Sequence, residues 1–120
     1  MDQETTISEL KEKVKMFCKE RDWDQFHNAK ELALALSVEA SELLEMFIWK
    51  TPEEVDQLLA NPKKREEIED ELADVFNYTL RLAGFYNIDL SQIFERKMKK
   101  NAAKYPVEKA KGTHAKYTEL

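Results

Sequence analysis

The sequence predicts an all-α protein: a helical bundle of four main helices and one short helix, assembled as an oligomer. Its 120 residues include only two glycines and three prolines, so the chain is short of the residues that build tight turns between strands. Helix-capping residues recur along it, each followed by apolar residues at helical spacing. A chain of this length is expected to form one domain around one core.

The first two helices are predicted from their N-caps, whose side-chain oxygens can accept a bond from a free backbone N–H. Thr6 begins a capping box with the glutamate three residues later, and the helix that follows is expected to end near Arg21. Asn28 also has a glutamate three residues on, and it opens a second helix to about Trp49.

The next two helices are predicted from a cap followed by proline. Proline suits the first helical position because its fixed φ is already helical and its missing N–H is not needed there. Thr51 before Pro52 therefore opens a short third helix. Asn61 before Pro62 repeats this pattern of a cap followed by proline, and it opens a fourth helix that extends to about Asn87.

The fifth helix begins at the cap Asp89 and must end at Pro106, which cannot donate a helical hydrogen bond. Residues 107–120 show no helical period and are interpreted as a C-terminal tail. The expected organisation is one helical domain over residues 1–106 followed by this tail.

Charge and cysteine usage narrow the class of partner. The net charge of −5 disfavours binding to a nucleic-acid polymer, because no basic excess is left to neutralise phosphates. The chain starts with acidic and polar residues, holds the single cysteine Cys18, and has no apolar run near the ~18 to 20 residues of a membrane span. We expect a cytoplasmic protein that has no membrane partner. The charge leaves a small anionic ligand open, provided that residues near its site supply positive charge.

The second helix carries a carboxylate where its core face should be apolar. Glu39 projects from the middle of an arc, with Glu42 beside it, and the apolar members of that arc are Leu32, Leu36, Leu43 and Met46. The opposite, polar side carries Ser37, Ser41 and Glu45, but Leu34, Val38 and Ile48 are scattered among them. A helix that is apolar nearly all round needs neighbours on several sides, which predicts a homo-oligomer.

The fourth helix repeats the anomaly. Glu71 and Asp74 have the same three-residue spacing as Glu39 and Glu42, and Tyr78 lies one turn beyond Asp74. The apolar stripe beside them is Ile68, Leu72, Val75, Phe76 and Leu82. If the two helices pack together, four carboxylates converge, and such a cluster needs cations because burying ionised carboxylates is costly. Oxygen ligands favour a hard ion, and Mg²⁺ suits best.

A second interpretation of these carboxylates stays open, and a third is excluded. Paired glutamates are often solvated or bound to lysines, so the chain could instead be a non-catalytic helical interaction module with salt bridges between subunits. A di-iron site is excluded, because it needs a Glu-x-x-His on each of two helices and neither His27 nor His114 has that spacing.

Residues elsewhere could bind a nucleotide. Lys97 and Asn101 fall on one face of the fifth helix, which is either a phosphate-binding face or an ordinary solvated one. Trp23, His27 and Trp49 lie near the ends of the second helix. Such aromatic residues are usually core, yet they can also stack on a base.

These motifs together resemble the MazG-like all-α nucleotide pyrophosphohydrolases, and within them the short dCTP pyrophosphatase branch. The resemblance spans nearly the whole chain and is carried by Arg21-Asp22-Trp23-Asp24-Gln25-Phe26-His27, Glu39-x-x-Glu42, Trp49-Lys50, Glu71-Leu72-x-Asp74 with Tyr78, Lys97-Met98-x-x-Asn101, Tyr105-Pro106 and Lys116-Tyr117-Thr118-Glu119-Leu120.

The resemblance implies a Mg²⁺-dependent enzyme that cleaves a nucleoside triphosphate, dCTP or a modified dCTP above all, between its α and β phosphates. The implied roles are metal binding by Glu39, Glu42, Glu71 and Asp74, phosphate binding by Tyr78, Lys97 and Asn101, and base binding by Trp23, His27 and Trp49. It also implies a tetramer built from tight dimers. The chain departs from the animal members at residues 28–30 and in its compact region 51–62, which puts the base preference in question.

Overall fold

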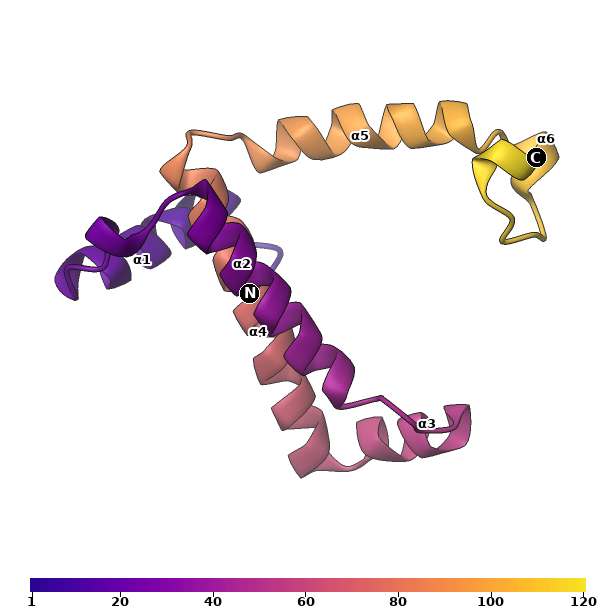
Figure 1. Ribbon diagram of the computed structural model, residues 1–120, viewed down its shortest axis with the longest axis horizontal. Coiled ribbons are helices and arrows are strands. Elements are labelled where there is room, and N and C mark those ends of the chain that lie inside the picture. Colours follow the sequence, from indigo (N-terminus) through magenta and orange to yellow (C-terminus); the bar gives the residue numbers. More distant parts are fainter. The chain divides into compact units, whose positions relative to one another are not determined.

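The computed structural model describes residues 1–120 as helices joined by turns (Figure 1). The predicted all-α class is confirmed. The chain forms two compact units, Met1–Asn87 and Ile88–Leu120, which are described separately. None of its helices combines the length and hydropathy that a membrane span requires.

The first unit is organised around one long helix. Its elements are α1 (Ile7–Glu20), the 3₁₀ turn η1 (Asp24–Phe26), α2 (Ala29–Glu45), α3 (Pro52–Ala60) and α4 (Pro62–Phe85). The long helix α4 contacts α1, α2 and α3. Helices α2 and α4 run side by side in opposite directions (Figure 1), so residues near the middle of one face the middle of the other.

The predicted helix starts are confirmed. In each of the five longer helices the capping side chain accepts a hydrogen bond from the backbone N–H three residues later, at 2.9–3.2 Å. The capping residues are Thr6, Asn28, Thr51, Asn61 and Asp89. Both predicted prolines stand in the first turn of their helices.

The predicted end of the second helix is wrong by four residues, since α2 ends at Glu45 rather than near Trp49. The chain then tightens into turns, in which the N–H of Phe47 donates to the carbonyl of Leu44 at 2.9 Å. Trp49 has φ 63°, in the left-handed region that residues with a side chain rarely adopt. This conformation ends the turns that follow α2, although the sequence contains no glycine there.

The buried core of the first unit is small for its length. Its buried apolar residues are Cys18, Leu32, Ile68, Leu80 and Ala83. Leu72 and Phe76 were expected in the core stripe of α4, but they are 56% and 42% exposed in the single chain. On α2, Leu34 and Val38 are also exposed. The surplus apolar surface on these two helices therefore lacks a partner within one chain.

The second unit contains α5 (Leu90–Lys104), the single-turn helix α6 (Val107–Ala110) and the 3₁₀ turn η2 (Tyr117–Glu119). Residues 107–120, which the sequence analysis interprets as a tail, thus include one short helix and one 3₁₀ turn, and elements this short show no period in the sequence. Tyr117 packs edge-to-face on Tyr105, with ring centroids 6.0 Å apart, and the Lys104 ammonium lies 4.8 Å from the Tyr117 ring. The domain boundary at residue 106 stays a prediction.

Candidate metal centre

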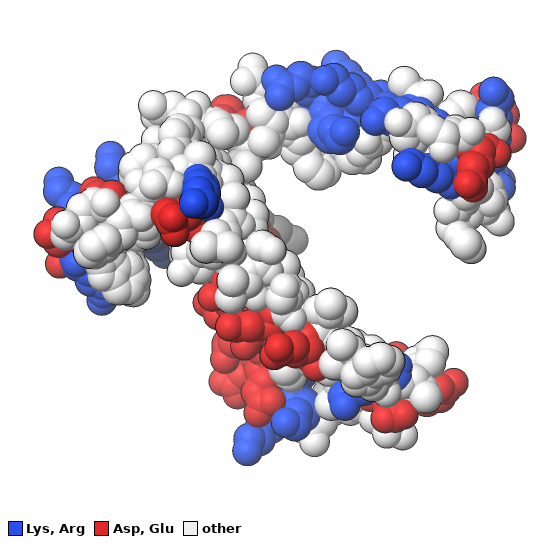
Figure 2. All heavy atoms as spheres, in the orientation of Figure 1, with Lys and Arg blue, Asp and Glu red and all other residues white.

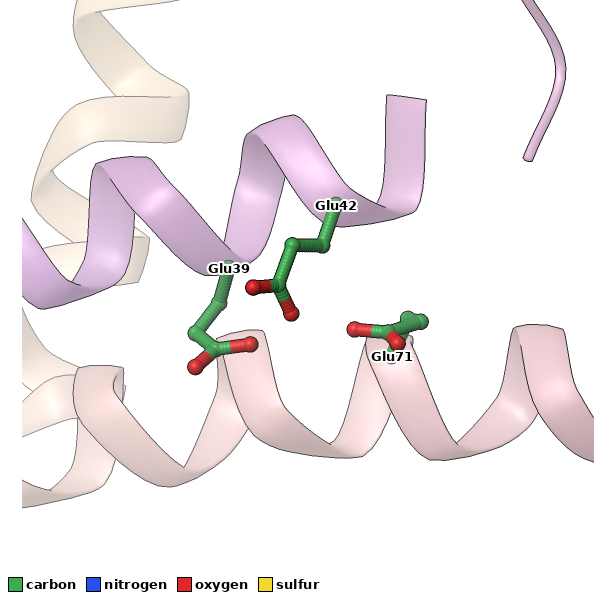
Figure 3. A group of neighbouring side chains, drawn as sticks. All are labelled: Glu39, Glu42 and Glu71. Atoms are coloured by element: carbon green, nitrogen blue, oxygen red, sulfur yellow. The ribbon is translucent and has the colours of Figure 1, made fainter. Parts of the chain in front are cut away.

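Three carboxylates meet where α2 packs on α4. Glu39 and Glu42 extend from α2 toward Glu71 of α4 (Figure 3), and one oxygen of each lies within 4.8 Å of the others. Glu39 and Glu42 share a helix face because they are three residues apart. These three residues are called the acidic cluster below. Asp and Glu side chains gather more widely on the surface of this helix pair (Figure 2).

Two oxygens of the acidic cluster are buried without a partner. Glu39 Oε2 and Glu71 Oε2 are shielded from solvent and accept no hydrogen bond. None of the chain's ion pairs involves the cluster. Buried polar atoms nearly always have a partner, so these oxygens call for a positive group that the surrounding side chains do not supply.

The electrostatics of the acidic cluster oppose its full ionisation. The pKa of Glu39 is raised to about 6, first by burial, then by a hydrogen bond with the Glu42 carboxyl and by the negative charges of Glu42, Asp74 and Glu71. The pKa of Glu71 is raised as well, by burial and then by the charge of Glu42. A bound cation would offset this repulsion.

The donor set fits a hard divalent cation. Every available ligand atom of the acidic cluster is a carboxylate oxygen, and no sulfur or imidazole nitrogen is among them. Mg²⁺ is bound in proteins through a few carboxylates together with waters and substrate phosphates. The two unpartnered buried oxygens give such an ion a place to bind.

The sequence predicted a fourth carboxylate, Asp74, which lies outside the acidic cluster. Its charge nevertheless raises the pKa of Glu39 and Glu71. One turn further on, burial raises the pKa of Tyr78, and the charges of Glu39 and Asp74 raise it further. Tyr78 thus belongs to the surroundings of the cluster, and metal binding by Asp74 stays a prediction.

The two predicted base-binding indoles do not meet in one chain. Trp23 precedes α2 and packs edge-to-face on Phe17, with centroids 5.7 Å apart. Trp49 follows α2 and is 93% exposed. A 17-residue α-helix is about 25 Å long, so the two side chains start from opposite ends of that length.

The third predicted base-binding residue, His27, is held by an arginine that sequence reasoning missed. Arg81 is 5% exposed; its Nε donates to His27 Nδ1 at 2.9 Å and its Nη2 to Asp24 Oδ1 at 2.5 Å. Burial, and then the charge of Arg81, lowers the pKa of His27. The available signal was that Arg81 is the only charged residue between Asp74 and Asp89.

The predicted phosphate-binding pair lies in the second unit. Lys97 and Asn101 are four residues apart on α5 and therefore share one face of that helix. Lys and Arg side chains gather along α5 (Figure 2). That Lys97 and Asn101 face the acidic cluster stays a prediction.

The raised pKa of Glu39 gives a pH-dependent stability. Between about 4.5 and 6 the folded protein holds a proton that the unfolded chain has lost, so stability falls as pH rises through this range. In EDTA, which removes bound cations, we expect the Tm of Glu39→Gln to exceed that of the wild type at pH 7. The difference in Tm should disappear toward pH 4.5, where Glu39 of the wild type is protonated and uncharged. Glu66→Gln, at an exposed position of α4, is the matched control and should leave the Tm nearly unchanged. A Tm for Glu39→Gln below that of the wild type at pH 7 would contradict the claim that repulsion among these carboxylates destabilises the fold.

Comparisons with known proteins agree over most of the chain. The model of the MazG-like family matches residues 34–120. The chain is 39% identical to dCTP pyrophosphatase 1 of Mus musculus and 38% identical to that of Homo sapiens, in each case over 98% of this chain and 69% of the relative. The crystal structure of a pyrophosphatase from Archaeoglobus fulgidus has a TM-score of 0.76 and 37% identity, covering 82% of this chain and 91% of that one. The chain belongs to the MazG-like family.

Proposed function

We propose that the protein is a Mg²⁺-dependent nucleoside triphosphate pyrophosphohydrolase that prefers dCTP or 5-modified dCTP and releases the monophosphate and pyrophosphate. The acidic cluster carries this proposal, because its unpartnered buried oxygens need a cation and its donor set suits Mg²⁺. Relatives named dCTP pyrophosphatase 1 support the reaction class and the base. Such an enzyme clears unwanted nucleotides from the pool.

Glu39, Glu42 and Glu71 would hold the cation, with Asp74 as the fourth carboxylate. When bound, Mg²⁺ neutralises charge on the triphosphate and makes a water molecule a better nucleophile. The contribution of the chain is to fix the carboxylates through the packing of α2 on α4 before substrate arrives. One glutamate of this group could also accept the proton of the attacking water, and no single residue is assigned as general base.

Tyr78, Lys97 and Asn101 would contact the phosphates. The raised pKa of Tyr78 keeps its hydroxyl protonated at neutral pH, so it can donate to a phosphate oxygen. Lys97 offers an ammonium and Asn101 an amide from one face of α5. Hydrogen bonds from such groups to phosphate oxygens are strong because the acceptor is charged.

Trp23, His27 and Trp49 would bind the base, and a pocket walled by both indoles needs two chains. One chain holds Trp23 and Trp49 at opposite ends of α2, so the second indole must come from another copy. Cytosine is a small ring that fits between two stacked aromatic walls, whereas a purine is larger. This arrangement supports a pyrimidine preference and a homo-oligomer together.

The exposed apolar residues of α2 and α4 support the same assembly. Leu34 and Leu72 are each 56% exposed, although the chain buries only a small core. Contact with a second copy would cover such residues. We propose a homotetramer in which the helix pair that carries the acidic cluster is also an interface.

The proposed reaction is tested by a panel of nucleoside triphosphates assayed for monophosphate and pyrophosphate with Mg²⁺. We expect dCTP or its 5-modified forms to be turned over fastest, because a two-walled pocket excludes purines by size. Faster turnover of a purine triphosphate at equal concentration would overturn the base preference. No pyrophosphate from any nucleotide, together with no rise in Tm on adding Mg²⁺ and nucleotide, would favour the interaction module.

Two site variants and one control variant, each of which changes the charge of a side chain but not its size, are assayed with the same panel. Glu39→Gln and Asp74→Asn should lower hydrolysis at least about a hundredfold, roughly 2.7 kcal/mol of transition-state stabilisation, while the protein stays folded. Glu66→Gln should retain wild-type turnover. Near-wild-type turnover in Glu39→Gln would remove that residue from the site.

Assembly and activity should be lost together. Leu34→Glu places a charge on an exposed apolar position of α2, and we expect it to dissociate the oligomer in light scattering and to abolish hydrolysis. Gln57→Glu adds the same charge at an exposed polar position of α3 and should change neither property. A fully active monomer would show that one chain builds the whole site.

A further inference from the structure

Arg81 is the one charged residue buried in the fold, and its side chain donates hydrogen bonds to the segment before α2. The guanidinium donates through Nε to His27 Nδ1 at 2.9 Å and through Nη2 to Asp24 Oδ1 at 2.5 Å. It also lies 5.0 Å from the centroid of the Phe85 ring. A buried guanidinium loses its hydration, so a fold that keeps one depends on these partners.

The N–H of Ala29, at the start of α2, donates to the Tyr86 hydroxyl at 2.6 Å and fixes the C-terminal end of the segment that Arg81 holds. The rest of this segment has few other ties. It links α1 to α2 through the short η1 turn, in which the N–H of His27 donates to the carbonyl of Asp24 at 3.1 Å. Asp22 has φ 54°, in the left-handed region that aspartate adopts more readily than most residues, and the Gln25 amide donates to its carbonyl and its carboxylate at 3.0 Å. Contacts within such a short link do not tie it to α4, whereas Arg81 does.

The direction of the hydrogen bond between Arg81 and His27 determines which imidazole nitrogen carries the proton. Arginine has donors only and is never deprotonated in proteins, so His27 Nδ1 must be the acceptor and must carry no proton. In a neutral imidazole the proton is then on Nε2. His27 therefore has one donor to offer, at Nε2, and no acceptor left to present.

We propose that Arg81 is a positioning residue of the nucleotide site, which ties the His27 segment to α4 and fixes His27 as a neutral imidazole that donates from Nε2 to an acceptor atom of the nucleotide. The part that concerns the nucleotide rests on the proposed function. The pairing of Arg81 with His27, and the protonation state that it sets, do not depend on that function. Arg81 itself touches no substrate in this proposal.

The first measurement observes His27 directly, in the full-length protein without nucleotide. After selective ¹⁵N labelling of histidine we expect, at pH 7, an unprotonated Nδ1 and a protonated Nε2 for His27. The chain has two histidines, so a His114→Gln variant identifies the His27 signals. In Arg81→Gln the pKa of His27 should rise, because a positive charge that disfavours the imidazolium is removed while the Asp24 carboxylate remains.

The second measurement is steady-state hydrolysis of dCTP with Mg²⁺. Arg81→Gln should raise KM about tenfold, the size of one lost hydrogen bond, while kcat changes less than about threefold. In a His27→Gln background the same substitution should change KM less than about twofold, because Arg81 acts through His27. Arg81→Lys keeps the charge but cannot form both bonds, so it should also raise KM.

Three results would overturn the proposal. The first is a proton on Nδ1, or a charged His27, in the wild type at pH 7. The second is an unchanged KM in both Arg81 variants. The third is an equal rise of KM with and without His27, which a merely structural role of Arg81 would give. If Arg81→Gln does not fold, the proposal is decided by the histidine spectra of the wild type and by the KM of Arg81→Lys. If the wild type turns over no nucleotide, the proposed function fails, whereas the histidine spectra still decide the pairing of Arg81 with His27.

Discussion

Three negative charges held in one small, partly buried space are the constraint on which the structure depends. Glu39, Glu42 and Glu71 repel one another across the α2–α4 contact, and two of their oxygens have no partner. The same contact supplies much of the limited apolar core. A bound cation would therefore satisfy two needs, because it would complete the proposed site and remove the repulsion that weakens the helix pair.

The length of α2 connects this site to assembly. The helix carries Glu39 near its middle, while Trp23 precedes it and Trp49 follows it, and its 17 residues span about 25 Å. A site that uses both indoles and the central carboxylates must therefore combine copies of the chain. Exposed Leu34 on the same helix offers the apolar surface for that contact. In the proposed oligomer, catalysis and assembly would both depend on α2, and this would explain why the helix is apolar nearly all round.

The features that local chemistry sets could be predicted from the sequence, and those set by distant contacts could not. A cap such as Asn28 needs only an N–H three residues away, and the spacing of Glu39 and Glu42 places both on one face. The partners of Arg81 lie more than fifty residues away in sequence, so nothing local reveals them. The left-handed conformation of Trp49, which ends the turns after α2, likewise has no signal in residue type.

The central claim is that the acidic cluster binds a divalent cation, and anomalous diffraction with Mn²⁺ in place of Mg²⁺ tests it most directly. In crystals of the full-length protein the account predicts a peak about 2.1 Å from oxygens of Glu39, Glu42 and Glu71, lost in crystals of Glu39→Gln. Crystals with no peak there, and with a lysine or arginine of a neighbouring subunit among the three carboxylates, would contradict the account.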